Sequence, residues 1–454
     1  MIFPRYPTYK DRGVEWLGEV PGHWEVVRLK HLLQRRITDG PHTTPEFVSE
    51  GVPFLSVDGI QDGELKFDGC RYISEDDHEE YRRKALPQRD DLLMGKAAST
   101  GKIARVKVDF EFSIWSPLAL IRLNPEASNP SFYEHSLKSP IVQAQIDNLC
   151  TANTQKNISM DDIPKLVLTR PPLVEQTQIA AFLDRETAKI DGLVAEQRRL
   201  MALLKEKRQA VISHAVTQGL NPHAPMKPSG VEWLGAVPAH WEVCPVRRVV
   251  SSIEQGWSPE CFARPADDEE WGVLKAGCVN RGIYDPSENK ALPIELAPVE
   301  AYEVHVGDVL MSRASGSPEL VGSTALVTST PGRLMLSDKI FRFQFENWIE
   351  PRFFVVALSS RPLRSQIEQA LSGGNGMANN LPQSSLLGFY LSVPPKSEQL
   401  EICAYLDNQT EKLDTLTTEA QRAIDLLQER RTALVSAAVT GQIDVRGLAA
   451  VATY

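Results

Sequence analysis

Two segments of this chain occur twice, and this internal repeat constrains the fold more than any other feature of the sequence. Residues 13–26, GVEWLGEVPGHWEV, return as residues 230–243, GVEWLGAVPAHWEV, after a shift of 217 positions. Residues 171–220 return as residues 394–443 after a shift of 223 positions, with nearly half of the positions identical. The 454 residues are therefore two copies of one plan, and this length also exceeds what a single core usually supports.

The regions between the repeated segments, about 150 residues in each half, resemble each other far less. Short echoes remain, such as DLLM at 91–94 against DVLM at 308–311, and Asn157 against Asn380. A duplication that served stability alone should have drifted evenly along its length. A constant frame around diverging regions favours two binding domains with different targets.

The second repeated segment predicts a long helix in each copy. Residues 175–217 contain no proline and one glycine, Gly192, so nothing in them ends a helix. About 40 helical residues would span roughly 60 Å. Apolar residues at heptad spacing predict a seam along which the two helices pair, antiparallel if the copies are related by an approximate two-fold axis. The alternative is two ordinary core helices in independent domains. The predicted seam comprises Ile190, Leu193, Leu200, Leu204 and Val211, interrupted by Gln197 and Lys207, and in the second copy Leu413, Leu416, Ala420, Ala423, Leu427 and Leu434, with Arg430 in place of Lys207.

The diverging regions have the pattern of mixed α/β domains with many short strands, so the expected fold class is α+β. Strands are predicted within 52–57, 103–108 and 118–123, and within 272–275, 324–328 and 340–345. Helices are predicted over 130–148 and 351–371. Residues 220–229, with three prolines, are predicted to link the two copies.

Polar loops in these domains carry side chains suited to nucleic acid. Lysine and hydroxyl groups suit phosphate, whereas arginine, asparagine and glutamine can also specify bases. An isolated polar loop is more often only a loop, but these loops occupy corresponding places in the two copies and differ in composition. The candidate DNA-binding residues are Arg35, Arg36, Thr38, His42, Thr43, Thr44, Lys96, Ser99, Thr100, Lys102, Asn153, Gln155, Lys156 and Asn157 in the first copy, and Trp257, Ser258, Arg313, Ser315, Ser317, Asn375, Met377, Asn379 and Asn380 in the second.

Charge and cysteine content place further limits on the chain. The net charge of −10 argues mildly against nucleic-acid binding, although acidic runs can face away from DNA while a basic partner supplies positive surface. The six cysteines form no Cys-x-x-Cys pair, which is typical of reduced thiols rather than of disulfides or a zinc site. No stretch has the length of a membrane span or a signal-peptide core. We therefore expect a cytoplasmic protein without a membrane contact.

Motifs that imitate catalytic sites fail on spacing or context. Residues 95–102, GKAASTGK, have five residues between the glycines instead of the four of a phosphate-binding loop, and Ile103 stands where Ser or Thr would bind Mg²⁺. Glu64 and Lys66 imitate part of a nuclease motif, but the nearby acids lie too close in sequence, so a surface hairpin is expected. Asn129-Pro-Ser-Phe132 lacks the second proline of an adenine-methylation motif and is expected to begin a helix. No catalytic or metal-binding residue is predicted.

Two diverging domains alternating with two near-identical helical segments resemble the specificity subunit of type I restriction-modification systems. The resemblance covers residues 13–443 and is most specific in the repeated VEWLGxVPxHW segments, in PPLVEQTQI at 171–179 and in DGPHTTP at 39–45, with GVPFL at 51–55. The second domain departs from the Asp-Gly-x-His form and has QGWSP at 255–259 instead, so it should recognise different bases. The expected division is a first target-recognition domain over 1–170, a helix over 171–218, a linker over 219–229, a second target-recognition domain over 230–393, a helix over 394–443 and a tail over 444–454.

The resemblance implies a non-catalytic, sequence-specific DNA-binding subunit. Each domain would recognise one half of an asymmetric bipartite site in double-stranded DNA, and the paired helices would set the unread gap. Two methyltransferase subunits and two ATP-dependent restriction (translocase) subunits would be the partners, and S-adenosylmethionine, ATP and Mg²⁺ would be bound by them rather than by this chain. Two rival hypotheses stay open: a chain that modifies DNA itself, and a coiled-coil adaptor that joins proteins without binding DNA.

Overall fold

In the computed structural model, the chain forms two compact units that do not follow chain order. Residues 3–152, 156–371 and 379–448 are described. Unit 1 combines residues 1–198 with 422–454, and unit 2 comprises residues 199–421. Two long helices, α4 (Leu173–Gln218) and α8 (Lys396–Val439), therefore each contribute one half to each unit. The domain boundaries expected from the sequence stay a prediction.

Unit 1 contains a four-stranded antiparallel sheet in the order β10-β9-β12-β4 and a three-stranded sheet in the order β11-β5-β8, in which β11 and β5 run parallel. Short two-stranded pairs, β1-β2, β3-β15, β6-β7 and β13-β14, complete the unit. The strands are β1 (Tyr9–Asp11), β2 (Glu19–Pro21), β3 (Glu25–Arg28), β4 (Thr38–Asp39), β5 (Val52–Leu55), β6 (Ile60–Gln61), β7 (Glu64–Leu65), β8 (Arg71–Ile73), β9 (Leu92–Gly95), β10 (Ile103–Arg105), β11 (Ser113–Ile114), β12 (Leu118–Ile121), β13 (Thr151–Ala152), β14 (Lys156–Asn157) and β15 (Val167–Arg170). The helices are α1 (Glu75–Tyr81), α2 (Pro130–Lys138) and α3 (Pro140–Leu149).

Unit 2 repeats this topology. Its four-stranded sheet has the order β19-β26-β22-β24, and its three-stranded sheet the order β21-β20-β25, again with one parallel pair, β20 and β25. The strands are β16 (Met226–Pro228), β17 (Ala236–Pro238), β18 (Glu242–Pro245), β19 (Val250–Gln255), β20 (Gly272–Leu274), β21 (Asn289–Ala291), β22 (Val309–Ser312), β23 (Ala314–Ser315), β24 (Thr324–Leu326), β25 (Leu334–Met335), β26 (Ile340–Phe345), β27 (Asn379–Asn380) and β28 (Tyr390–Val393). The helices are α5 (Pro351–Leu358), α6 (Arg361–Ala370) and α7 (Gln383–Leu387). The α+β class and each of the six predicted strands are confirmed.

The two helices predicted in the diverging regions are each broken in two. The stretch 130–148 ends at Lys138 as α2 and restarts as α3, because Pro140 cannot continue the hydrogen bonds of the first helix and instead occupies the first turn of the next. The stretch 351–371 breaks in the same way into α5 and α6, with Pro362 in the first turn of α6. The predicted helix start at Asn129 is confirmed, since its side chain accepts a hydrogen bond from the Phe132 amide at 3.0 Å. The hairpin predicted around Glu64 is also confirmed, as β6 and β7.

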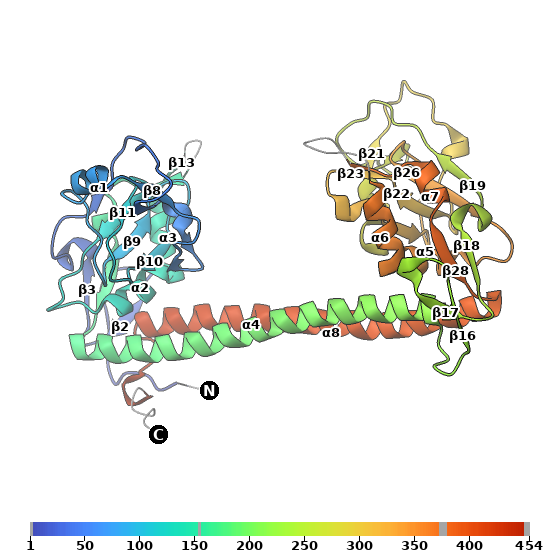
Figure 1. Ribbon diagram of the computed structural model, residues 1–454. Coiled ribbons are helices and arrows are strands. Elements are labelled where there is room, and N and C mark those ends of the chain that lie inside the picture. The colour runs from blue at the N-terminus through green and yellow to red at the C-terminus, as the bar shows by residue number, and fades with distance from the viewer. Residues whose placement is uncertain (1–2, 153–155, 372–378, 449–454) are drawn as a thin grey trace. The chain divides into compact units, whose positions relative to one another are not determined.

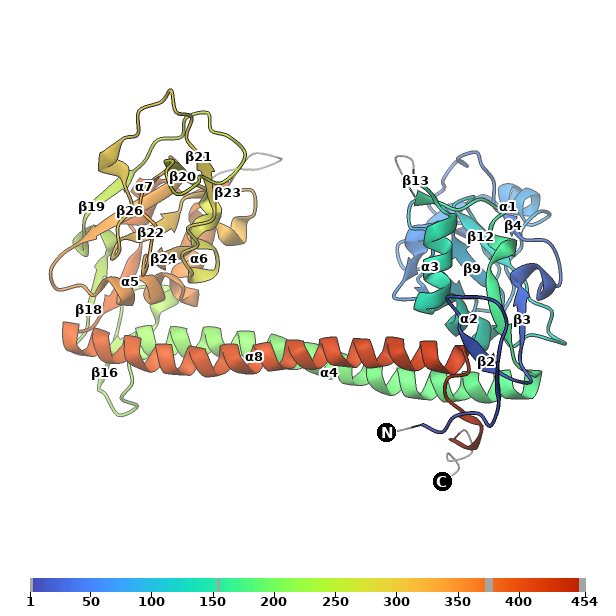
Figure 2. The same ribbon diagram turned by 180° about the vertical axis from the view of Figure 1, so that it is seen from behind.

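Within each unit, α4 and α8 lie side by side and run antiparallel (Figures 1 and 2). In unit 1, the Thr169 hydroxyl just before α4 contacts Val439 near the end of α8, and Asp191 further along α4 pairs with Arg431 at 2.9 Å. In unit 2, Arg208 pairs with Asp414 at 3.3 Å. The long helices and their antiparallel pairing are confirmed.

The predicted seam is right at one position of each heptad and wrong at the other. Ile190 and Leu204 are buried, as predicted, but Leu193, Leu200 and Leu416 are exposed. Residues one position later are covered instead, since Val194 and Ile424 are buried and Met201 and Thr417 are half-buried. The spacing is therefore four then three residues rather than three then four. Both spacings fit the apolar pattern, because leucines also occupy the outer positions.

The cores of the units include the helices. In unit 1, Trp24 packs with Ile179 and Leu183 of α4 and with Ala438 of α8. In unit 2, Trp241 packs with Ile212 of α4 and Ile402 of α8. Trp24 and Trp241, the second tryptophan of each repeated segment, are therefore core residues. The six cysteines are free, as predicted. Among the described residues, no helix combines the length and apolar character needed to cross a bilayer.

Candidate nucleic-acid interface

The polar loops singled out in the sequence meet at one end of the four-stranded sheet in each unit. In unit 1, β4 ends at Asp39 and β9 ends at Gly95, and both residues lie beside the start of β12. In unit 2, β19 ends at Gln255 and β22 at Ser312, both beside the start of β26. We call these places the loop edges. In both views β13 and β23 lie on the side of their domain away from the long helices (Figures 1 and 2).

The two loop edges share one backbone framework. The Lys96 amide donates to Pro117 O at 2.8 Å, and Lys96 O accepts from the Ile158 amide at 3.0 Å. In unit 2 the Arg313 amide donates to Lys339 O at 2.9 Å, and Arg313 O accepts from the Leu381 amide at 2.8 Å. A cationic residue therefore occupies the same backbone position in both units, directly after the central strand.

A glycine in each unit brings the first loop against the sheet. A Cβ atom added to Gly40 would lie 1.7 Å from Ile114 O, and one added to Gly256 would lie 1.9 Å from Leu336 O. Ile114 ends β11 and Leu336 directly follows β25, and these two strands hold equivalent places in the three-stranded sheets. The two glycines are therefore structurally equivalent. Their neighbours Asp39 and Gln255 therefore occupy equivalent positions too, and only glycine permits this approach.

In unit 1, three basic side chains surround the buried carboxylate of Asp39. The ammonium groups of Lys84 and Lys96 lie 2.5 and 2.7 Å from its oxygens, and His42 Nε2 lies at 3.3 Å. Burial acts to raise the pKa of Asp39, but the hydrogen bonds from Lys84 and Lys96 outweigh it and lower that pKa below its usual value. One carboxylate thus holds two ammonium groups at the loop edge, and the cluster stays positive.

In unit 2, the equivalent position holds a guanidinium beside an amide. Arg313 Nη1 donates to Asp338 O at 3.3 Å, and its guanidinium lies over the ring of Phe341. Gln255 donates to the same carbonyl at 2.9 Å. The carboxylate of Asp338 pairs with Lys339 at 3.1 Å and accepts from Ser258. The planar guanidinium can bind a guanine edge or a phosphate through two parallel hydrogen bonds in a rigid fork, a geometry that an ammonium group does not provide.

The structure brings most of the predicted residues together at the loop edges. Those that it gathers there are His42, Thr43, Thr44, Lys96, Ser99, Thr100, Lys102, Lys156 and Asn157 in unit 1, and Trp257, Ser258, Arg313, Ser315, Ser317, Asn379 and Asn380 in unit 2. Thr100 links two of the loops, since its hydroxyl donates to Lys156 O at 2.7 Å. Asn153, Gln155, Asn375 and Met377 lie outside the described residues.

Three predicted residues are placed differently. Arg35 and Arg36 precede β4 and lie near the opposite end of the sheet, because Leu33 bridges Leu123 beyond the far end of β12. Thr38 is half-buried within β4, and its hydroxyl has no hydrogen-bond partner in the described structure. Lys96 is also less available than expected, since only 12% of its side chain is exposed.

Lys84, Asp39 and Lys339 belong to the loop edges but were not among the candidate DNA-binding residues named from the sequence. Lys84 follows α1, 45 residues after Asp39, and no local pattern connects the two. Asp338 and Lys339 directly precede the strand predicted within 340–345, and that position is a weak signal for a loop residue. Among the described residues, no group of three or more His, Cys, Asp and Glu side chains could hold a metal ion.

The domains are docked on the helices through polar residues of the second repeated segment. Gln176 is fully buried: its side-chain oxygen accepts from the Asn129 amide at 2.8 Å, and its nitrogen donates to Ala127 O and Pro171 O at 3.1 and 2.8 Å. Gln399 makes the same three bonds in unit 2, to the Glu350 amide, Trp348 O and Pro394 O, at 2.7 to 3.0 Å.

The glutamate directly before each of these glutamines accepts hydrogen bonds from the histidine and tryptophan of the repeated segment. Glu175 accepts from His23 Nε2 at 2.8 Å, from Trp24 Nε1 at 3.0 Å and from the Tyr6 hydroxyl. Burial and the hydrogen bond to Glu175 raise the pKa of Tyr6, so the tyrosine stays a donor. Glu398 repeats two of these contacts, with His240 at 2.8 Å and Trp241 at 3.1 Å. The two histidines therefore help to hold each domain on its helix.

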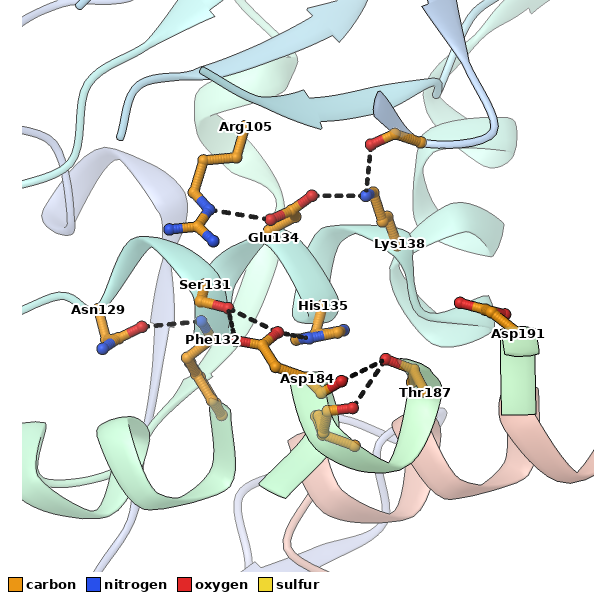
Figure 3. A network of polar contacts seen from close by, with 12 residues as sticks. Arg105, Asn129, Ser131, Phe132, Glu134, His135, Lys138, Asp184, Thr187 and Asp191 are labelled. Atoms are coloured by element: carbon orange, nitrogen blue, oxygen red, sulfur yellow. Dashed lines mark hydrogen bonds and ion pairs between the residues drawn. The ribbon is translucent and has the colours of Figure 1, made fainter. Parts of the chain in front are cut away.

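A second docking contact differs between the units. In unit 1, Asp184 of α4 accepts from Ser131 at 2.9 Å and from His135 at 2.7 Å, both on α2 (Figure 3). In unit 2, the corresponding Asp407 pairs with Arg352 of α5 at 2.6 Å. The carboxylate is kept, whereas its partner on the diverging domain changes.

These features define a class of protein: a duplicated recognition scaffold whose two domains share one frame, present different cationic loop edges and dock on a shared antiparallel coiled coil. The family model described as "Type I restriction modification DNA specificity domain" matches residues 21–198. The EcoEI type I specificity subunit of Escherichia coli is 31% identical over 240 residues, which are 52% of this chain and 40% of that protein. The EcoKI specificity subunit of E. coli K12 is 23% identical over 94% of this chain and 90% of its own length.

Solved structures show the same fold. A chain from the work titled "Structural basis underlying complex assembly and conformational transition of the type I R-M system" matches with a TM-score of 0.71, at 17% identity, over 92% of this chain and 98% of that one. The HsdS subunit from Thermoanaerobacter tengcongensis matches with a TM-score of 0.51, at 16% identity, over 93% and 98%. Residues 21–198 thus match the DNA specificity domain of type I restriction-modification systems, and nearly the whole chain is similar in sequence and in fold to specificity subunits of these systems.

Proposed function

We propose that this chain recognises an asymmetric two-part sequence in double-stranded DNA, with one loop edge on each half-site. The observation that carries the proposal is the equivalence of the two edges: Lys96 and Arg313 occupy the same backbone position, but their surroundings differ. A constant backbone frame places side chains at the same depth in a groove, and different side chains then select different bases.

The contacts at the edges divide by chemistry. Lys84, Lys102 and Lys156 present ammonium groups suited to phosphate, whereas Arg313, Asn157 and Asn380 are suited to base edges. The remaining edge residues named from the sequence add hydroxyl and aromatic groups. Because the chain as a whole has a net charge of −10, we expect basic surfaces of partner subunits to complete the DNA channel.

The chain also serves as a scaffold in this proposal. Two methyltransferase subunits and two restriction (translocase) subunits assemble on it and bring S-adenosylmethionine, ATP and Mg²⁺. Because α4 and α8 each contribute to both units, we expect their length to set the unread gap between the half-sites. The chain acts in the cytoplasm, where the DNA is.

The test is to profile methylated adenines in a host that expresses this chain with its co-encoded methyltransferase. Replacing residues 230–393 by the same region of a relative should change one half of the methylated sequence and leave the other half and the gap intact. Altered bases in both halves would refute the assignment of one half-site to each unit. Absence of sequence-dependent methylation with the unaltered chain, together with no gel shift of duplex DNA, would favour the adaptor hypothesis.

A further inference from the structure

The repeated segment at 13–26 and 230–243 is identical at 12 of its 14 positions, and the fold explains most of them. The glycines at 13, 18, 230 and 235 have positive φ angles between 63° and 77°, which favour glycine. Leu17, Val20 and Trp24 are buried, as are their counterparts. His23 and Trp24 bind Glu175. These positions are the same in both copies because the frame needs them.

One repeated pair has no such role among the residues that the structure describes. Glu15 and Trp16 lie at the tip of the β1–β2 hairpin, and Glu232 and Trp233 at the tip of the β16–β17 hairpin. Trp16 is 44% exposed and Trp233 is 41% exposed. In the described part of the chain, neither indole hydrogen-bonds or stacks on another ring. The neighbouring leucines anchor the tips, so the tryptophans are not needed to hold them.

The two tips have the same local structure. In unit 1, the amides of Leu17 and Gly18 donate to Val14 O at 2.9 and 3.2 Å. In unit 2, the amides of Leu234 and Gly235 donate to Val231 O at 3.1 and 3.2 Å. The two units therefore present the same indole and the same carboxylate on the same turn.

The partner that meets these tips must be the same in both units. DNA does not fit, because the half-sites differ, and the shared carboxylate of Glu15 and Glu232 repels phosphate. The β16–β17 hairpin also lies beyond the long helices, on the side away from β21 and β23 (Figures 1 and 2). Tryptophan is the residue most enriched among energetic hot spots of protein interfaces. The tips are therefore suited to a protein partner of which two copies bind this chain, one at each tip.

We propose that the two hairpin tips, centred on Trp16 and Trp233, are equivalent docking sites for the methyltransferase subunit, one copy per unit. This inference rests on the proposed function. An enzyme that modifies both halves of a site must be held in the same place relative to each recognition domain, although the recognised bases differ. Identical tips joined rigidly to each domain through the Trp24–Glu175 and Trp241–Glu398 contacts meet that requirement.

The experiment measures how many copies of the co-encoded methyltransferase bind the full chain, by native mass spectrometry and titration calorimetry. The unaltered chain should bind two copies. Trp16→Ala and Trp233→Ala should each weaken one site by about 30-fold, the effect of losing a hot spot of about 2 kcal/mol, and the double variant should weaken both. Trp16→Phe, which keeps an aromatic ring, should retain most of the affinity. Ile294→Ala, at a position 95% exposed in unit 2, is the control and should bind two copies normally.

The outcomes separate the inference from the function on which it rests. If the unaltered chain binds no methyltransferase, both are wrong. If the double variant melts like the unaltered chain and binds two copies with unchanged affinity, the docking sites are wrong and the function stands. The docking sites are also wrong if the double variant keeps both methyltransferases but loses the restriction subunit, because the tips would then serve that other partner.

Discussion

The two units differ least where the domains meet the helices and most at the loop edges. Gln176 and Gln399 make the same three buried hydrogen bonds, although two of the three residues that each of them bonds belong to diverging sequences. Likewise, the side-chain amide of Gln145 bonds both the N–H and the C=O of Val167. Gln366 does the same with Tyr390. Because these contacts reach backbone atoms, the diverging domain can change its side chains without losing its attachment.

At the loop edges the contacts are between side chains, and they differ. Asp39 gathers Lys84 and Lys96 in unit 1, whereas the equivalent Gln255 in unit 2 leaves Arg313 without a carboxylate at that position. The contacts that attach the domains to the helices thus reach backbone atoms, whereas the loop edges, which differ between the units, are built from contacts between side chains. Substitutions on the frame should therefore act equally in the two units wherever both units make the same contacts, and substitutions on the edges should not.

The largest expected effect comes from the buried glutamines. Gln176→Ala leaves the Asn129 amide and two carbonyls without partners, which should cost unit 1 about 3 kcal/mol of unfolding free energy. Gln399→Ala should cost unit 2 about the same, since its three bonds are equivalent. Hydrogen exchange followed by mass spectrometry measures each unit separately. Losses that differ by more than a factor of two would contradict the idea of one frame.

The next largest effect should break the symmetry of the frame. Glu175→Ala removes the acceptor of Tyr6, Trp24 and His23 at a carboxylate that is 6% exposed, at an expected cost of about 2 kcal/mol. Glu398 is 23% exposed and lacks the tyrosine, so water can replace it, and Glu398→Ala should cost only about 1 kcal/mol. Urea unfolding monitored by tryptophan fluorescence gives both values. Tyr6→Phe is the control that should remove much of the difference.

How much of this could be predicted from the sequence depends on the range of each contact. The long helices and the strand centres follow from local pattern, since residues 175–217 contain nothing that ends a helix. The breaks after Lys138 and before Arg361 were missed because the apolar pattern continues across them, while Pro140 and Pro362 decide the backbone. The seam was half wrong because Leu193 and Val194 both fit a heptad, and only packing chooses between them.

The loop edges show the same limit. Their loops could be named because they hold polar residues at matching places in two copies. The position of Lys84 at Asp39 could not be predicted, since it depends on how α1 is placed by the three-stranded sheet. The opposite error affected Arg35 and Arg36, which adjoin the first loop in sequence but lie at the far end of β4. Residues a few positions apart in an extended chain lie far apart in space, because the chain rises about 3.3 Å per residue.

A smaller effect compares the two cations at the loop edges. Arg313→Ala should weaken binding of the cognate duplex by about tenfold, because no carboxylate at the Gln255 position holds this guanidinium. The slope of log affinity against log salt concentration should fall by about one. Lys96→Ala should weaken binding only about threefold, since Asp39 already neutralises much of its charge. Fluorescence anisotropy of the complete methyltransferase complex measures both. Equal effects of the two substitutions would mean that the carboxylate does not distinguish the edges.

Asp39→Gln sharpens this comparison by giving unit 1 the residue found in unit 2. Loss of the carboxylate frees Lys84 and Lys96, so affinity for duplex DNA of unrelated sequence should rise about threefold at low salt, with a steeper salt dependence. Methylation profiling should then show a loss of base selectivity in the half-site recognised by unit 1 and unchanged selectivity in the other half-site. Relaxation in both halves would contradict the separation of the edges.

The smallest effect concerns Asp184, whose partners on α2 differ from those of Asp407 on α5. Burial acts to raise the pKa of Asp184, but its hydrogen bonds with His135 and Ser131 outweigh burial and lower that pKa. A carboxyl with a lowered folded-state pKa adds stability that is fully present above its unfolded pKa of about 3.9 and is lost as pH falls through the folded value. Because 52% of the side chain is exposed, we expect Asp184→Asn to cost less than about 1 kcal/mol at pH 5. The difference in melting temperature between Asp184→Asn and the unaltered chain should therefore shrink from pH 5 to pH 3.

The matched variant in unit 2 is Asp407→Asn, which breaks an exposed pair with Arg352. Its difference in melting temperature from the unaltered chain should shrink when salt is raised to about 1 M, because salt screens exposed ion pairs. If the differences of both variants respond to salt alone, the network around His135 adds nothing beyond an ordinary surface ion pair. The docking of the two units would then be equivalent at this position as well, and the contrast between frame and edge would begin only at the loops.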